Sequence, residues 1–400
     1  MTSDFIWREL PALAAKFDRI LLVPFGTKAD FDYENIHNKI EVIALPATLC
    51  KSLFGKVLLC ILGIAAMPFA VFQIVKHLKE APKSSVAKYQ NAIFLSYQLG
   101  GDLLALILLL MKRPKNTLVL YYWIHPFGFL TTTVLQKIGI CKKSIARGHG
   151  SDIYKDTIGF PRSLLRYALI SDVDLFTFVH EAGRNYFSSY YKVDLSKTFV
   201  HRLGVEKQEN IISKWTSDET MRVLSCAYIV DFKRIPLIAE SLALFCNQSG
   251  VKVHWTHIGG GVNLDNYLKQ LSSHPLLTTE FTGSVPKERV VDLMKESNPH
   301  LFVHLSRLEG LPVSVMEAMS MGVPCIATSA GGTSELVDST VGALLPIEVS
   351  PQDVANAIRD VISRIAVGED ITAAVNSRFS SMIDNEANSQ RFAEFLEQQL

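Results

Sequence analysis

The sequence predicts an α/β protein with two doubly wound parallel sheets. Short apolar segments of strand length alternate with helical stretches along the chain, which is the pattern of parallel β-α-β units. A polar, weakly patterned passage at residues 205–218 separates two halves of this alternation. A length of 400 residues also suits two or three domains of ordinary size. We therefore expect one domain at residues 1–205 and a second at residues 206–400, with ligands bound beyond the carboxyl ends of the strands.

The first half opens with a helix, which apolar periodicity predicts for residues 5–16. Apolar strands follow it, interrupted by a long apolar helical region. The strands expected in this half are residues 19–23, 41–45, 117–122, 143–146 and 175–179. The segments on either side of the helical region, 19–23 and 117–122, are expected to belong to one sheet.

The second half shows its strands more clearly, and each is followed by a helical stretch. The strands expected here are residues 222–226, 252–258, 280–282, 301–305 and 324–328. No internal repeat or low-complexity tract interrupts them, so a second parallel sheet is expected.

Composition and charge exclude several classes of protein. Forty Lys and Arg against thirty-nine Asp and Glu give a net charge of +1, which argues against a dedicated nucleic-acid binder. The six cysteines are scattered without C-x-x-C or metal-ligand spacing, so we expect reduced thiols in a cytoplasmic protein. Asp4, Arg8 and Glu9 interrupt any apolar signal-peptide core at the start.

An uncharged run at residues 57–75 raises the question of a membrane, as does a mean hydropathy of +0.20. Pro68 and Gln73 within the run, and the strands on either side of it, argue against a spanning helix. Two interpretations are favoured over a span, which stays the third: core helices with a solvated basic face, or peripheral contact with the anionic inner face of the cell membrane. The basic residues that would make this contact are Lys76, Lys79, Lys83 and Lys88.

The most informative segment, residues 301–337, reads L-F-V-H-L-S-R-L-E-G-L-P-V-S-V-M-E-A-M-S-M-G-V-P-C-I-A-T-S-A-G-G-T-S-E-L-V. It predicts a buried strand, a short loop, a helix and a second strand. Pro312 is placed as the first helical residue, and Gly322 ends the helix. A helix that begins directly after a strand and loop presents unpaired N–H groups, which suit a phosphate.

Two glutamates flank the start of this helix. Glu309 lies just before it, and Glu317 lies about 7–8 Å along its axis from Pro312 at 1.5 Å per residue. A nucleotide sugar fits this spacing, with the diphosphate on the helix amides, the ribose at Glu317 and the sugar near Glu309. The alternative is that Glu309 caps the helix and Glu317 is solvated.

The wider motif decides between them. Glu309-x7-Glu317 within S-R-L-E-G-L-P-V-S-V-M-E-A-M-S-M-G-V-P-C-I-A-T-x-x-G-G resembles the donor site of family 4 retaining glycosyltransferases, which have the GT-B fold of two Rossmann-like domains. Weaker resemblances lie upstream, at residues 225–235 (S-C-A-Y-I-V-D-F-K-R-I), 257–261 (H-I-G-G-G), 281–285 (F-T-G-S-V), 146–154 (A-R-G-H-G-S-D-I-Y) and 200–205 (V-H-R-L-G-V).

The resemblance implies a UDP- or GDP-linked sugar as donor, with no other cofactor and no metal. It implies roles at the transferred sugar and the leaving diphosphate for Glu309, His149 and Lys233. Donor contacts are implied for Glu317, Gly310, Leu311 and Arg234. It also implies that the last helix, residues 390–399, crosses back onto the first domain.

Two departures from the family pattern stand out. Tyr228 occupies the position of an arginine that usually pairs with the diphosphate, so Lys233, with Arg234, must neutralise the leaving group. The chain also opens directly with a helix, whereas the family begins with a strand and a glycine-rich loop. We therefore expect either that the coding start is misplaced or that the first domain lacks one strand and a donor-side loop.

Other candidate sites are weaker. Asp172-x-Asp174 has metal-binding spacing but is interpreted as the start of a strand. Gly259–Gly261 lacks the third glycine of a dinucleotide motif, since position 264 is Leu. His180 and Glu181 are expected at a cleft edge or a cap. Gly331–Gly332 should form a tight turn, and Glu335 should cap the following helix.

The expected function is transfer of a sugar, with retention, from a nucleotide sugar to an acceptor hydroxyl. A lipid-linked saccharide in surface polysaccharide synthesis is the favoured acceptor, because the first half is apolar and flanked by lysines. Two alternatives remain: a nucleotide-sugar epimerase or hydrolase of the same fold, and an inactive pseudo-transferase that serves as a partner subunit.

Overall fold

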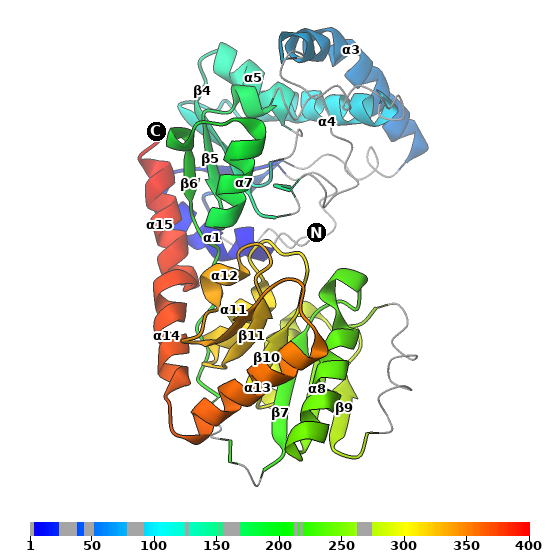
Figure 1. Cartoon of the computed structure of the whole chain (residues 1–400). Coiled ribbons are helices and arrows are strands. Elements are labelled where there is room, and N and C mark those ends of the chain that lie inside the picture. The colour runs from blue at the N-terminus through cyan, green and yellow to red at the C-terminus, as the bar shows by residue number, and fades with distance from the viewer. Residues whose placement is uncertain are drawn as a thin grey trace. The chain divides into compact units, whose positions relative to one another are not determined.

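The chain divides into two compact units. The computed structural model describes residues 4–23, 38–43, 52–77, 92–124, 128–150, 152–154, 169–211, 215–216, 219–261 and 274–400. The first unit comprises Met1–Val179, Gly183–His201 and Ser389–Leu400, and the second comprises His180–Ala182 and Arg202–Asn388. Figure 1 colours both along the chain.

The first unit contains two parallel sheets among its described residues. Its elements are α1 (Asp4–Lys16), β1 (Ile20–Leu22), β2 (Ile40–Val42), α3 (Leu53–His77), α4 (Ala92–Met111), β3 (Thr117–Tyr121), α5 (Phe129–Lys137), β4 (Cys141–Gly148), β5 (Leu175–Phe178), α7 (Glu181–Tyr191) and β6 (Thr198–Val200). The larger sheet has the order β3-β4-β5-β6, and β1 and β2 form a separate pair. Each helix and strand predicted here is present with shifted bounds, except that residues 44 and 45 of the second strand lie outside the described residues.

The prediction that residues 19–23 and 117–122 share a sheet is wrong. In the described part of the chain, β1 pairs with β2 in the register Ile20↔Ile40, whereas β3 pairs with β4. The two segments share a core instead, because Ile20 and Leu118 pack against the same buried cluster. Apolar pattern identifies which strands are buried together, but it does not identify which edges are hydrogen-bonded.

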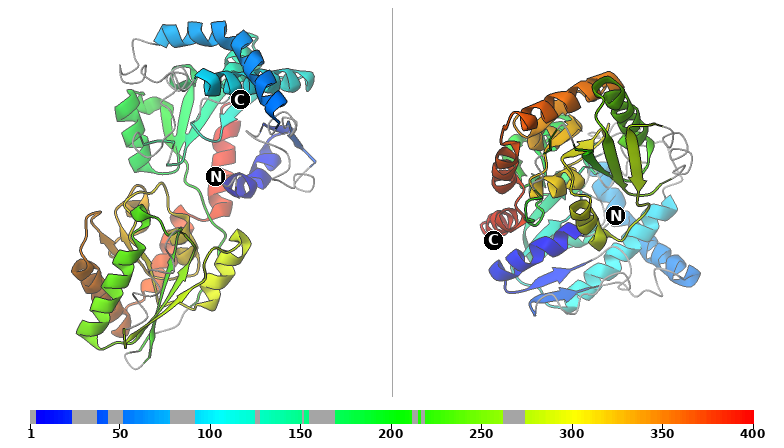
Figure 2. Two further views of the ribbon diagram at one scale, coloured as in Figure 1. Left: turned by 90° about the vertical axis from the view of Figure 1, so that its right-hand side faces the viewer. Right: turned by 90° about the horizontal axis from the view of Figure 1, so that it is seen from below.

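Helices α3 and α4 pack against each other (Figure 2). Residues 57–75 all lie within α3, which continues through Pro68. The approach is close at Gly100, where a Cβ would lie 1.7 Å from the Leu59 carbonyl oxygen. Leu59 is therefore buried, as predicted for a core helix. None of the helices in the described ranges has both the length and the apolarity needed to cross a bilayer.

The other face of α3 is apolar and exposed. The side chains that form it are Leu53, Phe54, Val57, Ile61 and Ile64, exposed by 50% to 80%. Their spacing places them along one side of the helix. The prediction of core helices therefore describes only half of α3. Of the four lysines expected beside it, Lys79, Lys83 and Lys88 lie outside the described residues.

The last helix completes the core of the first unit. Helix α15 (Asn385–Glu397) begins among residues of the second unit, and from Ser389 onward it belongs to the first. Phe392, Ala393 and Leu396 are buried in one cluster with Leu10 of α1 and Ile145 of β4.

The second unit is built on a six-stranded parallel sheet. Its elements are β7 (Met221–Cys226), α8 (Ile235–Ser249), β8 (Val253–Ile258), β9 (Leu277–Phe281), α10 (Val290–Glu296), β10 (Leu301–His304), α11 (Val313–Ser320), β11 (Cys325–Thr328), α12 (Thr333–Leu336), β12 (Gly342–Leu345), α13 (Pro351–Ala366) and α14 (Ile371–Met382). The strand order is β12-β11-β10-β7-β8-β9. Helices α8 and α13 lie side by side over one face (Figure 1).

Strand β10 pairs with both β7 and β11, so the carboxyl ends of these three strands lie at one edge. All five predicted strands of this half are present, although β9 begins three residues before the predicted start. Strand β12 was not predicted. The loops that follow β7, β10 and β11 at this shared edge carry the candidate site.

Candidate functional site

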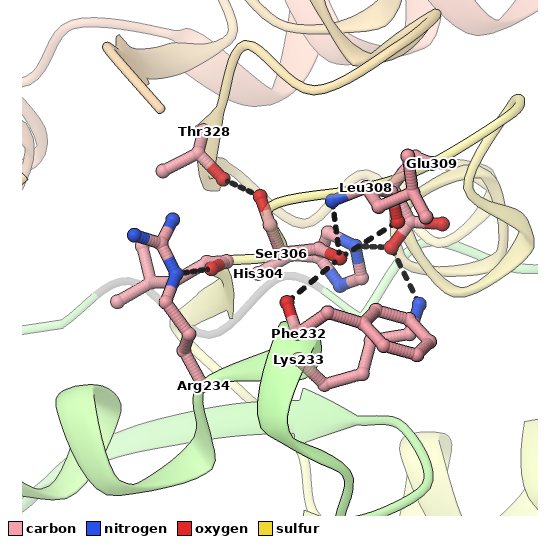
Figure 3. A network of polar contacts seen from close by, with 9 residues as sticks. Phe232, Lys233, Arg234, His304, Ser306, Leu308, Glu309 and Thr328 are labelled. Atoms are coloured by element: carbon pink, nitrogen blue, oxygen red, sulfur yellow. Dashed lines mark hydrogen bonds and ion pairs between the residues drawn. The ribbon is translucent and has the colours of Figure 1, made fainter. Parts of the chain in front are cut away.

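The loop after β10 is fixed by hydrogen bonds from both neighbouring loops (Figure 3). Arg307 N–H donates to the Phe232 carbonyl oxygen at 2.8 Å. The Ser306 hydroxyl donates to the carbonyl oxygen of Leu308 at 2.9 Å, and the Thr328 hydroxyl donates to that of Ser306 at 2.5 Å. The backbone that carries Glu309 is therefore held in place by residues after β7 and at the end of β11.

Two glycines after β11 complete this support, in the tight turn that was expected. Gly331 has a φ of +54°, and a Cβ there would lie 2.0 Å from the Glu309 carbonyl oxygen. Gly332 N–H donates to the Gly310 carbonyl oxygen at 2.7 Å. Only glycine allows the two loops to approach so closely.

Helix α11 begins next to this loop without a side-chain cap. Pro312 is the N-cap residue and Val313 the first helical residue, one position later than predicted. Gly322, with a φ of +78°, follows the end of the helix as expected. Pro312 makes no side-chain capping hydrogen bond, and the hydrogen bonds of Glu309 go to Lys233 and His304 rather than to the start of the helix. The first amides of α11 remain suited to an anion.

The Glu309 carboxylate instead binds two basic side chains. One oxygen, Oε1, lies 2.5 Å from Lys233 Nζ and 2.7 Å from His304 Nε2 (Figure 3). Glu309 and Lys233 are 10% and 19% exposed, and His304 only 4%. Burial raises the pKa of Glu309, but the hydrogen bonds and charges of His304 and Lys233 outweigh this effect and lower the pKa to about 2. Glu309 is therefore an anion at neutral pH.

Glu317 and Lys233 both lie close enough to Cys226 to affect its thiol. Both influence the thiol of Cys226, the last residue of β7: burial raises the pKa of Cys226 to about 12, the charge of Glu317 raises it, and the charge of Lys233 lowers it. Glu317 is half-buried, so the alternative of a fully solvated side chain does not describe it. The structure thus brings Lys233, Glu309 and Glu317 to one edge of the sheet.

Arg234 is placed differently from Lys233, although it is the next residue. It adopts a φ of +51°, and its guanidinium donates to the carbonyl oxygens of Leu305 and Ile347 at 2.5 and 2.7 Å. Burial lowers the pKa of Arg234, as does the charge of Arg307. Arg234 therefore ties the start of α8 to the strand-end loops, while Lys233 contacts Glu309.

The glycines after β8 are explained by packing. A Cβ at Gly259 would lie 2.0 Å from the Ala227 carbonyl oxygen, one at Gly260 2.3 Å from Ser284 Oγ, and one at Gly261 2.4 Å from the Ile229 carbonyl oxygen. These glycines bring the loops after β7, β8 and β9 together. Packing between these loops therefore accounts for the three glycines without a dinucleotide site.

His149 lies in the first unit, at the end of β4. Its ring stacks on Trp123 with a centroid distance of 4.2 Å and an interplanar angle of 28°. The Asp152 carboxylate accepts hydrogen bonds from the N–H groups of His149, Gly150 and Ile124, which closes the turn. Trp123 thus orients the imidazole, and Asp152 fixes the backbone that carries it.

The other acidic candidates have structural partners. The Asp174 carboxylate accepts hydrogen bonds at 2.8 Å from the backbone N–H and the hydroxyl of Ser144. Asp172 and Asp174 stand at the entry to β5, as expected for a strand start. Among the described residues, no group of three or more His, Cys, Asp or Glu side chains could hold a metal ion.

Glu335 does not cap the helix that follows Gly332, because it lies inside α12. Its carboxylate accepts a hydrogen bond from Glu181 N–H at 2.6 Å and is paired with Arg202 at 2.5 Å. His180, beside them, is fully buried, and burial with the Arg202 charge lowers the pKa of His180 to about 4. The contact of Glu181 with Glu335 is therefore made by the backbone N–H of Glu181 and not by its side chain.

Sequence reasoning missed His304. Its signal is a basic residue at the end of an otherwise apolar strand, L-F-V-H, five residues before Glu309. It also missed Trp123 as the stacking partner of His149, although both lie at strand ends. Neither contact follows from sequence spacing alone.

Part of the second unit is similar to a known protein family. Residues 207–370 match the family Glycosyl transferases group 1. Lys233, His304, Glu309 and Glu317 all lie in the matched segment.

Two curated relatives are glycosyltransferases by name. The amylovoran biosynthesis glycosyltransferase AmsK of Erwinia amylovora is 26% identical over 212 residues, which are 50% of this chain and 51% of AmsK. TuaC of Bacillus subtilis (strain 168), named as a putative teichuronic acid biosynthesis glycosyltransferase, is 34% identical over 104 residues, which are 25% of this chain and 26% of TuaC. The chain thus spans about half and about a quarter of these relatives.

The fold is shared over almost the whole length of a solved structure. The Anabaena protein HepE, solved in complex with UDP, aligns with a TM-score of 0.65 at 17% identity, covering 99% of this chain and 96% of HepE. The predicted α/β architecture is therefore confirmed, and the fold is that of GT-B glycosyltransferases.

Proposed function

We propose that this chain is a retaining glycosyltransferase of family 4. It moves a sugar from a UDP- or GDP-linked donor to the hydroxyl of a saccharide acceptor. The observation that carries the proposal is the contact between Lys233 and Glu309 beside the uncapped start of α11, within the segment that matches the glycosyltransferase family.

The chemistry follows from these groups. The donor diphosphate would lie on the first amides of α11 and on Lys233, which supply positive charge where the leaving group develops negative charge. Glu317, further along α11, would accept hydrogen bonds from the ribose hydroxyls. The acceptor oxygen would form a bond to the anomeric carbon while the bond between that carbon and the diphosphate oxygen breaks. The proton of the acceptor hydroxyl would pass to the departing diphosphate.

A metal ion is not needed for this scheme, because the amides and Lys233 neutralise the diphosphate. Excess EDTA should therefore leave turnover unchanged. If turnover is lost and Mg²⁺ or Mn²⁺ restores it, this part of the proposal is contradicted, and Asp172 becomes a candidate metal ligand.

The exposed apolar face of α3 supports a lipid-linked acceptor and peripheral contact with a membrane. Phe54 and Leu53, 77% and 80% exposed, are large side chains whose transfer from water is favourable by about 1.5–3 kcal/mol each. AmsK and TuaC are named for the synthesis of amylovoran and teichuronic acid. We propose that this face contacts the bilayer in which such an acceptor is anchored.

Thermal melting with UDP, GDP and ADP, and with their sugars, tests the donor site. One nucleotide series should raise the melting temperature of the wild type but not of Glu317→Ala. Glu296→Ala removes an exposed glutamate on α10 of the same unit and should keep the response. A wild type that responds to none of these nucleotides would contradict the proposal.

Turnover separates the proposal from its alternatives. Consumption of the donor without any acceptor would favour an epimerase or hydrolase. Binding that depends on Glu317, without turnover in the presence of lipid-linked saccharides, would favour a pseudo-transferase.

Vesicle co-sedimentation tests the membrane contact. The wild type should sediment with phosphatidylglycerol vesicles, more weakly at high salt, and Phe54→Ser should reduce the bound fraction. Val367→Ser, which removes an apolar side chain that is 84% exposed in the second unit, should have no effect. Equal binding by all three proteins would remove the role of α3.

A further inference from the structure

The shared oxygen of Glu309 poses a question about the donor site. Lys233 is the cation expected to bind the diphosphate, yet its ammonium already contacts Glu309 Oε1 at 2.5 Å. A diphosphate would therefore compete with this carboxylate for the N–H groups of Lys233. Glu309 is 10% exposed, so a carboxylate left without a partner there would be costly.

His304 supplies the second partner. Its Nε2 lies 2.7 Å from the same oxygen, at hydrogen-bonding distance. A carboxylate can only accept, so the contact is favourable when Nε2 carries the proton and donates it. His304 comes from β10, which is paired on both sides in the centre of the sheet, so its position does not depend on the loop. Figure 3 shows His304 and Lys233 converging on Glu309.

We propose that His304 is a positioning residue, which holds Glu309 at the site so that Lys233 can move from this carboxylate to the donor diphosphate. This inference rests on the function proposed above. His304 itself does not touch the donor. It acts by keeping the buried carboxylate satisfied after the ammonium leaves, which lowers the cost of nucleotide binding.

The surrounding contacts allow this exchange. The backbone at Glu309 is fixed by Ser306, Arg307 and the glycine turn, so the loop does not need to move when one side-chain contact breaks. Lys233, in contrast, ends a 3₁₀ helix, Asp231–Lys233, and its long side chain can reorient about a fixed backbone. The mobile partner is therefore the lysine, and the histidine is the fixed one.

Calorimetric titration with UDP, or with whichever nucleoside diphosphate raises the melting temperature, tests the inference without an acceptor. His304→Leu should bind UDP about tenfold more weakly, the order expected for a lost hydrogen bond to a charged group. His304→Gln should bind nearly as well as the wild type, because its amide can donate from a similar position. Glu309→Gln should bind UDP more tightly than the wild type, because Lys233 is then released.

A double-mutant cycle separates positioning from a merely structural role. On the Glu309→Gln background, His304→Leu should no longer change UDP affinity, because there is no carboxylate to hold. Phe302→Leu alters a fully buried residue two positions earlier on β10, and it should lower the melting temperature while leaving UDP affinity unchanged.

Three outcomes overturn the inference: unchanged UDP affinity in His304→Leu, an equal loss on both backgrounds, or an equal loss in Phe302→Leu. Failure of the proposed donor site looks different, because the wild type would then bind no nucleotide. If the wild type binds UDP and Lys233→Ala does not, the donor site stands and only the role of His304 is in question.

Discussion

Arg147 and Glu9 form an ion pair that is completely enclosed in the first unit. Arg147 Nη1 lies 2.6 and 2.8 Å from the two carboxylate oxygens, and the two side chains are 0% and 3% exposed. The Tyr122 hydroxyl also donates to Glu9, and the guanidinium lies 4.2 Å from the ring centroid of Phe392. Arg147 Nη2 donates to the His201 carbonyl oxygen. One arginine thus connects α1, β4 and α15.

Replacing Glu9 by Ala should lower the free energy of unfolding by about 3–5 kcal/mol, because it leaves the Arg147 charge buried without its partner. Urea unfolding measures the change. Glu397→Gln breaks the exposed pair of Lys16 and Glu397, which also joins α1 to α15, and should change stability little. Similar losses in both variants would show that burial does not distinguish the two pairs.

Gly331→Ala should weaken nucleotide binding and destabilise the second unit, because its Cβ would meet the Glu309 carbonyl oxygen at 2.0 Å. Gly139 provides the control: its φ is +75°, but nothing lies within 4 Å of a Cβ there. Gly139→Ala should cost only about 1–2 kcal/mol for the left-handed backbone and leave nucleotide affinity intact. Unchanged UDP affinity in Gly331→Ala would show that the loop around Glu309 can adjust.

Asp102 should make stability depend on pH. Its carboxylate accepts a hydrogen bond from Leu130 N–H at 2.7 Å at the start of α5, and burial raises its pKa from 3.8 to about 6. An acid whose pKa is raised on folding binds its proton more tightly in the native state. Its contribution to stability is therefore complete below about pH 3.8 and is lost as pH rises through 6.

Asp102→Asn should remove this dependence. Relative to that variant, the wild type should gain up to about 3 kcal/mol of unfolding free energy as pH falls from about 7 to about 4. Urea unfolding of both proteins across this range measures the difference. A constant difference would mean that Asp102 keeps its ordinary pKa.

Gly100→Ala should separate α3 from α4, because the added Cβ would lie 1.7 Å from the Leu59 carbonyl oxygen. Backbone cannot yield as a flexible side chain can, so we expect a loss of melting temperature and faster hydrogen exchange in both helices. Ile107→Ala, on α4 at a position 46% exposed, should have little effect on either measurement. Full retention of stability in Gly100→Ala would contradict this close packing.

Much of the second unit could be predicted from sequence, because its central strands are fully buried. Leu301–His304 and Cys325–Thr328 are buried at every position, and continuous apolar runs indicate such strands clearly. In β9 only Leu277 is buried and the other residues are exposed or partly exposed, so its start was misplaced. β6 and β12 have only three and four residues, too few for a periodic pattern to emerge.

The candidate site was predictable in its parts but not in its contacts. Helix and loop chemistry indicated Glu309, and the resemblance indicated Lys233, but their direct contact joins residues that are 76 positions apart. The partners of Arg234 are backbone carbonyl oxygens, and a sequence does not show which carbonyls remain without N–H donors. His304 was missed for a related reason, since a strand residue next to a loop can point to either face.

The path of α15 has a consequence for the order in which the protein is made. Phe392, Ala393 and Leu396 belong to the core of the first unit, yet the ribosome reaches them only after the whole second unit. During synthesis of residues 202–388, Arg147 therefore lacks the aromatic ring of Phe392 beside it. Apart from His180–Ala182, which are made earlier, the second unit is one stretch of chain that can fold during translation, whereas the first unit is completed only after its last twelve residues have emerged.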